Sequence, residues 1–176
     1  LKRGLPDIPT NVLIRVGIDG LSESLRKRVN KPITDDMIVE YFERLLHRGH
    51  VNFKMFFIFG YPWERMEDFD HFEQLMRRVF ALPLRVNVSL RIKWTPFIPQ
   101  PCTPLGKERA RYDYRMVDKI NVWHALNARP RRNPGWYVEN DGLMEKRSHD
   151  WQCKLTAGDE RVLLRLRDAK PLWRME

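Results

Sequence analysis

Short apolar runs alternate with amphipathic segments along the first half of the chain. The runs at 12–18, 51–60 and 86–94 are rich in β-branched and aromatic residues, and each predicts a buried strand. Between these runs, apolar positions recur at helical spacing and predict helices over 35–49 and 66–80. Strands that alternate with helices indicate an α/β fold with parallel strands and helical crossovers.

The pattern becomes less regular after the third predicted strand. Residues 95–106, "TPFIPQPCTPLG", contain four prolines and predict a stiff, extended loop. Apolar spacing predicts further helices over 110–128 and 157–170. We expect the intervening residues 129–150 to be irregular, apart from a short strand at 136–140.

Polar and apolar residues alternate along the third predicted strand. One face carries Val86, Val88, Leu90 and Ile92, and the other carries Asn87, Ser89, Arg91 and Lys93. The first predicted strand repeats this pattern weakly, with Arg15, Gly17 and Asp19 on one side. The polar face either lines the lumen of an open α/β barrel that holds a charged ligand, or belongs to an edge strand with one solvated face.

Composition limits the classes of protein that fit this pattern. The chain has 176 residues, 43% of them hydrophobic, which is enough for one globular domain with a sizeable core. No segment is long and apolar enough to span a membrane, and no secretory signal opens the sequence, so we expect no membrane partner. Two cysteines form a poor disulfide framework for this length, which favours a reducing, cytoplasmic location. A net charge of +9 permits an anionic partner without requiring one.

The most informative stretches follow the three predicted strands. They read "GIDGLSESLRKRVNK" at 17–31, "FFIFGYPWE" at 56–64 and "KWTPFIPQPCTPLG" at 93–106. In α/β folds the carboxyl ends of parallel strands are where ligands bind. Glycine at such a position allows a ligand close to the backbone, and proline fixes the direction of the chain.

These stretches resemble the second half of a radical SAM enzyme. The first is similar to the family phrase "GIESGSERLRKxxNKG", the second to a "GLPGE" turn, and the third to "PFxPKPxTPF". The third stretch looks most like the cobalamin-associated branch, and "LTAGDERVLLRL" at 155–166 is similar to an "xSRGDRRV" segment of that branch. The resemblance implies the carboxyl-terminal half of a partial TIM-type (β/α)6 barrel at 1–106, followed by a helical extension at 107–176.

The resemblance also implies a chemistry and its cofactors. The expected parent enzyme cleaves S-adenosylmethionine (SAM) with a [4Fe–4S] cluster and modifies an unknown substrate by radical chemistry, with methyl transfer and cobalamin as candidates. Its cluster is held by three cysteines near the first strand, a motif that Cys102 and Cys153 cannot supply. We therefore predict no metal ligands in this chain, which we interpret as part of a longer enzyme that lacks the amino-terminal half of the barrel.

The first motif maps onto four candidate cofactor-binding residues. The resemblance implies that Gly17, Asp19, Ser22 and Arg26 help to hold the ribose and amino-acid part of SAM. A carboxylate accepts hydrogen bonds from ribose hydroxyls, and a guanidinium suits the methionyl carboxylate. The alternative for Ser22 and Arg26 is a helix cap and a solvated helix face.

The other two motifs supply four more candidates, and the polar face of the third predicted strand supplies a fifth. The resemblance places Gly60 and Pro62 beside adenine, with Ile98 and Pro99 as apolar partners. Arg91, together with Lys93, faces the expected lumen and can meet an anionic substrate or a cofactor carboxylate. For Glu64 we favour capping of the following helix over a role in binding.

A non-catalytic protein is the alternative to an enzyme. The positive charge, six tryptophans and "ARPRRNPGWY" at 128–137 suit a module that binds nucleic acid through phosphate contacts and stacking. A degenerate barrel that serves as a partner subunit is a further possibility.

Overall fold

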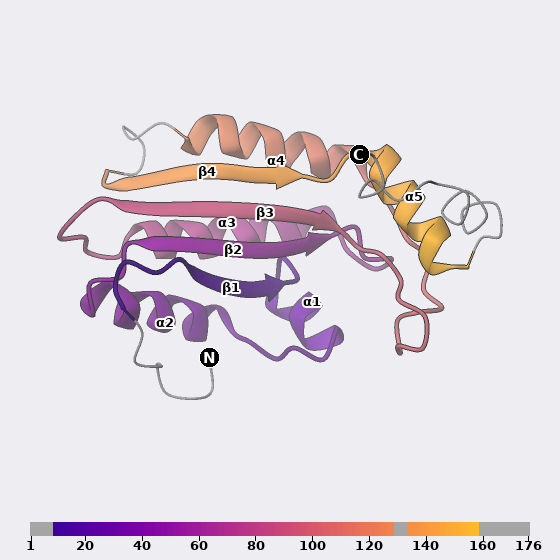
Figure 1. The fold of residues 1–176 in the computed structure, drawn as a ribbon, viewed down its shortest axis with the longest axis horizontal. Coiled ribbons are helices and arrows are strands. Elements are labelled where there is room, and N and C mark those ends of the chain that lie inside the picture. The colour runs from indigo at the N-terminus through magenta and orange to yellow at the C-terminus, as the bar shows by residue number, and fades with distance from the viewer. Residues whose placement is uncertain (1–8, 129–133, 159–176) are drawn as a thin grey trace, which may run out of the picture.

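A four-stranded parallel sheet forms the centre of the protein in a computed structural model, which describes residues 9–128 and 134–158 (Figure 1). The sheet order is β1-β2-β3-β4, so each strand lies beside its neighbour in the sequence. The strands are β1 Ile14–Asp19, β2 Asn52–Phe59, β3 Val88–Pro96 and β4 Trp136–Leu143. All three strand pairs are parallel, which confirms the predicted α/β fold.

The described helices connect the strands and leave one face of the sheet uncovered. They are α1 Glu23–Arg28, α2 Asp35–His47, α3 Met66–Phe80, α4 Tyr114–Asn127 and α5 Lys146–Thr156. In Figure 1, α3 passes behind the strands, and no described helix crosses in front of them. The helix α5 follows β4 and lies beyond the carboxyl ends of the strands (Figure 1).

Aromatic side chains fill the core between the sheet and the helices. Phe72 of α3 makes edge contacts with Phe57 of β2, Trp94 of β3 and Trp123 of α4, with ring centroids 4.9–5.0 Å apart. The Trp94 indole N–H also donates a hydrogen bond of 2.6 Å to Nε2 of His124. Burial lowers the pKa of His124 to about 4, so the ring is neutral at pH 7 and carries its proton on Nδ1.

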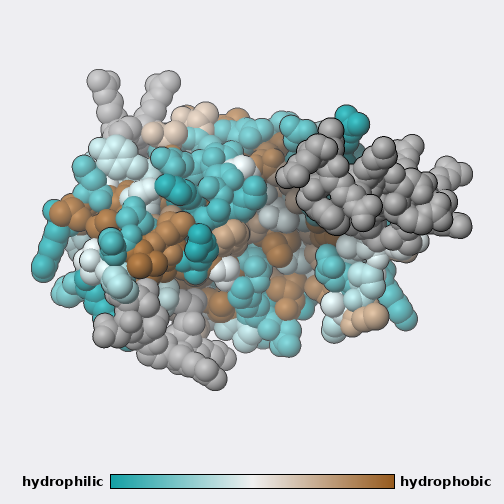
Figure 2. Space-filling model, in the orientation of Figure 1, coloured by the Kyte–Doolittle hydropathy of each residue, from teal (hydrophilic) through white to brown (hydrophobic). Residues whose placement is uncertain are grey.

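The face of the sheet that points away from the helices carries the polar residues of each strand. Burial alternates along β1, β2 and β3, with the buried set facing the helices. We call the opposite side the open face; Figure 2 views it directly and shows hydrophilic residues interspersed with hydrophobic ones. Because β3 pairs with both β2 and β4, the interpretation of β3 as an edge strand is wrong.

The region beyond residue 106 differs from the sequence-based expectation. The short strand predicted at 136–140 is present and extends to Leu143, so residues on both sides of position 106 share one sheet. Only Trp136 and Val138 of β4 are buried, which explains why its apolar signal was short. The helix α5 was not predicted, because its residues are mostly polar. The helix predicted at 157–170 lies outside the described residues, apart from 157 and 158.

Candidate functional site

The ends of β1, β2 and β3 meet at one cavity of about 580 Å³, which we call the tip cavity. This volume lies within the range of small-molecule sites. The walls come from the carboxyl end of each strand and the segment that follows it, and are formed by Asp19, Arg28, Val29, Asn30, Ile58, Tyr61, Thr95, Pro96, Phe97, Ile98, Gln100, Thr103, Pro104 and Leu105. The three stretches singled out in the sequence therefore border one hollow at the carboxyl end of the sheet.

Asp19 supplies the carboxylate at this cavity. It has a positive φ of 67°, a conformation that Asp tolerates better than most residues, and the register with β2 shifts between Gly17 and Asp19. Its Oδ2 lies 2.5 Å from Nζ of Lys31, and the two side chains are 29% and 32% exposed. The carboxylate at the cavity thus belongs to a partly solvated ion pair, and its other neighbours in the wall are largely apolar.

An aromatic stack forms another wall. The Tyr61 ring lies 4.9 Å from Phe97 and 5.1 Å from Trp63, and the Arg28 guanidinium sits 4.4 Å above Trp63. Burial, with smaller contributions from the carboxylates of Asp19 and Glu64, raises the pKa of Tyr61. The phenol therefore stays neutral and is available as a hydrogen-bond donor.

The Gly-x-Pro turn after β2 has a structural explanation. Gly60 has a φ of 81°, and a Cβ at this position would lie 2.2 Å from the Arg111 carbonyl oxygen. The Gly60 N–H donates to Glu64 Oε2, and the Glu64 N–H donates to the Tyr61 carbonyl at 3.0 Å. The backbone of residue 111 lies so close that it leaves no room for a side chain at position 60, so glycine is required there. The turn in which Gly60 lies holds Tyr61 in the cavity wall.

Glu64 closes this turn and does not cap the next helix, so that expectation was wrong. The N-cap of α3 is Arg65, whose N–H donates to Asp68 at 2.7 Å. Glu64 is 9% exposed, and among the described residues its Oε1 has no hydrogen-bond partner. Burial raises the pKa of Glu64 to about 8; the Gly60 N–H opposes this shift, and the carboxylates of Asp68 and Asp113 add to it.

Ser22 and Arg26 lie inside the protein and not in the tip cavity. Ser22 is the N-cap of α1, accepts from the Leu25 N–H at 3.3 Å and donates to Asp68, which confirms the helix-cap alternative. Arg26 is fully buried, so the solvated-face alternative is wrong. Its guanidinium donates to the carbonyls of Ile33 and Gly20, at 2.7 and 3.3 Å, and to the Asp35 carboxylate.

The remaining candidates divide between three places. Ile98 lines the tip cavity, and Pro99 is half-buried in the same loop but outside the cavity wall. Pro62 lines a second hollow of about 630 Å³, which lies between α1 and α3 and shares Arg28 with the tip cavity. Gly17 and Arg91 lie on the open face. Arg91 pairs with Glu139 at 3.4 Å, away from the tip cavity.

Arg28 and Tyr61 are among the cavity residues that sequence reasoning did not name as candidates. Arg28 follows two other basic residues, and nothing in that run distinguishes it from a solvated helix position. Tyr61 stands between the two residues of the turn that drew attention, Gly60 and Pro62. Its role follows from its burial against Phe97, a contact between residues far apart in the sequence.

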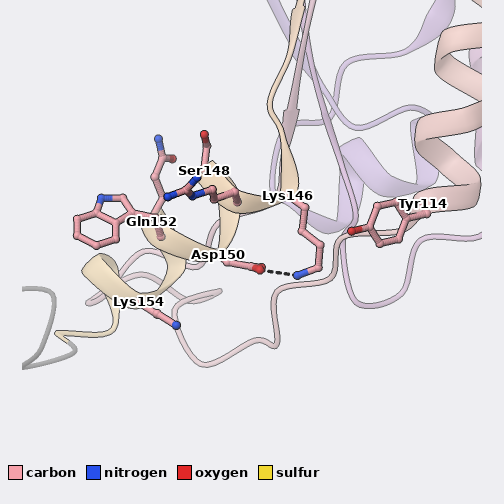
Figure 3. Close-up of a pocket in the computed structure, with 8 residues that line it drawn as sticks. Tyr114, Lys146, Ser148, Asp150, Gln152 and Lys154 are labelled. Carbon is pink, nitrogen blue, oxygen red and sulfur yellow. Dashed lines mark hydrogen bonds and ion pairs between the residues drawn. The ribbon is translucent and has the colours of Figure 1, made fainter.

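A larger hollow lies beside α5 but offers no convergent chemistry. It has a volume of about 850 Å³, and its principal contact is the 2.5 Å ion pair between Lys146 and Asp150. Figure 3 shows Lys154 pointing to the opposite side of the helix from Ser148 and Gln152. Since these groups do not meet at one point, the tip cavity remains the better candidate site.

Comparisons with known proteins do not assign the chain to a family. No known protein family matches this sequence, and no curated protein matches it. Within residues 9–128 and 134–158, no group of three or more His, Cys, Asp or Glu side chains is placed to hold a metal ion. In the same described part of the chain, no helix combines the length and apolar character needed to cross a membrane.

Replacement of Arg26 by Ala should destabilise the fold. It leaves the Gly20 and Ile33 carbonyls and the Asp35 carboxylate without a buried donor, so we expect a loss of about 3 kcal/mol in the free energy of unfolding. Urea unfolding at pH 7 measures the change, and exposed Lys27→Ala in the same helix is the matched control. Coincident unfolding curves for the two variants would contradict this role.

Replacement of Gly60 by Ala separates steric clash from backbone strain. Gly49 has a similar φ of 87°, but a Cβ there would meet only the Thr10 methyl group, at 3.7 Å. We expect Gly49→Ala to cost about 1 kcal/mol through the left-handed backbone alone, and Gly60→Ala to cost roughly 2 kcal/mol more through contact with Arg111. Thermal unfolding of both variants tests this; equal losses would exclude the clash.

Glu64 should make stability fall as the pH rises. Its pKa is about 8 in the folded state against 4.5 as the ordinary value, so the folded state binds more protons between these limits. The pKa of His124 is about 4 in the folded state against an ordinary value of 6.5, so this residue affects the pH dependence of stability only below pH 6.5. Between pH 6.5 and 8 we therefore expect wild type to lose stability at up to about 1.4 kcal/mol per pH unit.

The matching variant is Glu64→Gln, which keeps an acceptor for the Gly60 N–H but cannot ionise. Urea unfolding at several pH values should give a flat profile for Glu64→Gln above pH 6.5, and an unchanged slope for exposed Glu67→Gln. A slope that persists in Glu64→Gln would assign the effect to another group.

Proposed function

We propose that this chain is the SAM-binding, carboxyl-terminal half of a radical SAM enzyme. The observation that supports it most directly is the tip cavity, where the three family-like stretches border one hollow at the carboxyl end of a parallel sheet. Within the proposal, residues 14–96 form the last three strands of a partial TIM-type (β/α)6 barrel. The polar open face of the sheet agrees with a barrel lumen that the amino-terminal half of the enzyme covers.

The tip cavity has groups that suit each part of SAM. The Asp19 carboxylate serves the ribose hydroxyls, as the motif implies. Adenine packs against Ile98, with Tyr61 and Phe97 as neighbouring aromatic surface. As the partner of the methionyl carboxylate we propose Arg28 and no longer Arg26, which is buried. The Arg28 guanidinium borders the cavity and is held over Trp63. Gly60 and Ser22 then act indirectly, by fixing the turn and the start of α1.

The iron–sulfur cluster does not fit the residues of this chain. A [4Fe–4S] cluster in this family needs three thiolates, and the chain has two cysteines. Cys102 is exposed, and Cys153 lies 3.4 Å from His149 of its own helix. The proposal therefore assigns the cluster, which supplies the electron that cleaves SAM, to residues outside this chain. An upstream coding sequence with a Cys-x-x-x-Cys-x-x-Cys motif would support this assignment.

The nucleic-acid alternative is weakened by the tryptophans. Trp94, Trp123 and Trp136 are at most 5% exposed, so their rings belong to the core and are not free to stack on bases. Trp63 is covered on its faces by Tyr61 and Arg28. The basic stretch at 128–137 lies partly outside the described residues. We therefore give the enzyme interpretation priority.

Calorimetric titration with SAM tests the proposal. We expect saturable binding that weakens roughly tenfold in Asp19→Asn and in Arg28→Gln, because each variant removes a charged hydrogen-bonding group from the cavity. Asp70→Asn is the matched control, since Asp70 forms an exposed pair with Lys119 on the helical side. Titration of the same proteins with cobalamin addresses the second expected cofactor.

The outcomes separate cleanly. If Asp19→Asn and Asp70→Asn bind SAM equally well, the tip cavity is not the binding site. Absence of SAM binding in the wild-type chain, together with no three-cysteine motif in the complete reading frame, would refute the radical SAM assignment. If SAM binds as expected, the substrate and the transferred group become questions for the intact enzyme.

A further inference from the structure

The sheet register aligns three cations across the open face. Arg15 of β1 pairs in register with Lys54 of β2, Lys54 pairs with Arg91 of β3, and Arg91 pairs with Glu139 of β4. All four side chains point away from the helices, because they alternate with the buried positions. We call Arg15, Lys54 and Arg91 the cationic row.

Among the described residues, the carboxylates that pair with the cationic row both lie on β4, beside the Arg91 end of the row. Glu139 lies 3.4 Å from Arg91, and Asp141 lies 2.5 Å from Lys54. The Asp141 carbonyl also accepts a hydrogen bond from Lys93, one step further along the face, at 3.4 Å. Four cations on this part of the face therefore share two carboxylates, both on β4. Within the described residues, the side chain of Arg15 at the far end has no hydrogen bond or ion pair.

Like charges on adjacent strands oppose the pairing of those strands. Neighbouring strands lie about 5 Å apart, so the backbone positions of Arg15, Lys54 and Arg91 span roughly 10 Å. The side chain of Lys54 is only 19% exposed and its ammonium lies 5.1 Å from the Phe56 ring centroid, so water screens this charge incompletely. An anion that bridges the row relieves this repulsion.

We propose that the cationic row is a binding site for a small molecule that carries a diphosphate or two neighbouring oxyanion groups. Arginine at each end suits bidentate contact with phosphate oxygens, and the central lysine supplies a point charge. The span of roughly 10 Å between the outer strands suits two linked anionic groups better than one. The absence of a side chain at Gly142 leaves space on this face, since a Cβ there would lie 2.8 Å from Lys93 Nζ.

This site is separate from the proposed SAM site. Lys54 precedes Ile58, a wall residue of the tip cavity, by four positions on the same strand face, which corresponds to about 13 Å. A ligand on the cationic row therefore leaves the tip cavity free. The inference does not depend on SAM binding, and its test uses no SAM.

Pyrophosphate is the probe, and its binding to this chain is measured by calorimetry at low ionic strength. We expect Arg91→Gln to weaken binding roughly tenfold, because it removes a charged donor. The matched control is Arg44→Gln on α2: Arg44 is 49% exposed and pairs with Glu40, as Arg91 is 47% exposed and pairs with Glu139. Arg44→Gln should leave the affinity unchanged. Binding should also weaken steeply as salt is raised.

A variant that is expected to bind pyrophosphate more tightly distinguishes an effect on binding from an effect on folding. Glu139→Gln frees Arg91 from its carboxylate partner, so we expect pyrophosphate to bind several-fold more tightly, a gain that damage to the fold cannot produce. Equal affinity in Arg91→Gln and Arg44→Gln overturns the proposal, as does an unchanged affinity in Glu139→Gln. Failure of pyrophosphate to bind, with salt-sensitive binding of single-stranded RNA instead, overturns it in favour of a nucleic-acid surface.

Discussion

Parallel pairing of β1, β2 and β3 is the constraint on which the rest of the structure depends. Parallel neighbours require a crossover, so a helix follows each strand and covers the same face of the sheet. Because the strands run in one direction, their carboxyl ends meet at one edge, where loops distant in sequence become the walls of the tip cavity. The open face results from the same one-sided covering.

The loops at this edge are fixed by polar contacts to backbone groups. Arg26 ties the end of β1 to the segment before α2 through the Gly20 and Ile33 carbonyls. Glu64 and the carbonyl of Arg111 fix the turn after β2, so Tyr61 enters the cavity wall from a rigid position. The buried ionisable groups Arg26 and Glu64 shape the hollow from outside, while Asp19 and Arg28 border it directly.

Regular elements were predictable from the sequence where burial is one-sided and continuous. The predicted helix at 66–80 has the observed bounds of α3, because its apolar stripe packs along the whole sheet. β4 was predicted only in part and α5 not at all, since both are mostly polar. At the site, Asp19 and Ile98 were placed at the hollow by their motifs. Arg26 and Arg28 are two positions apart and look alike in sequence, and only long-range contacts decide that one is buried and the other borders a cavity.

The position of Arg28 has a consequence for how the two hollows near the strand ends behave. Its guanidinium rests on the Trp63 ring and forms part of the wall of both the tip cavity and the hollow between α1 and α3. A single side chain thus belongs to both walls. A molecule that draws this cation off the indole in one hollow therefore alters the wall of the other.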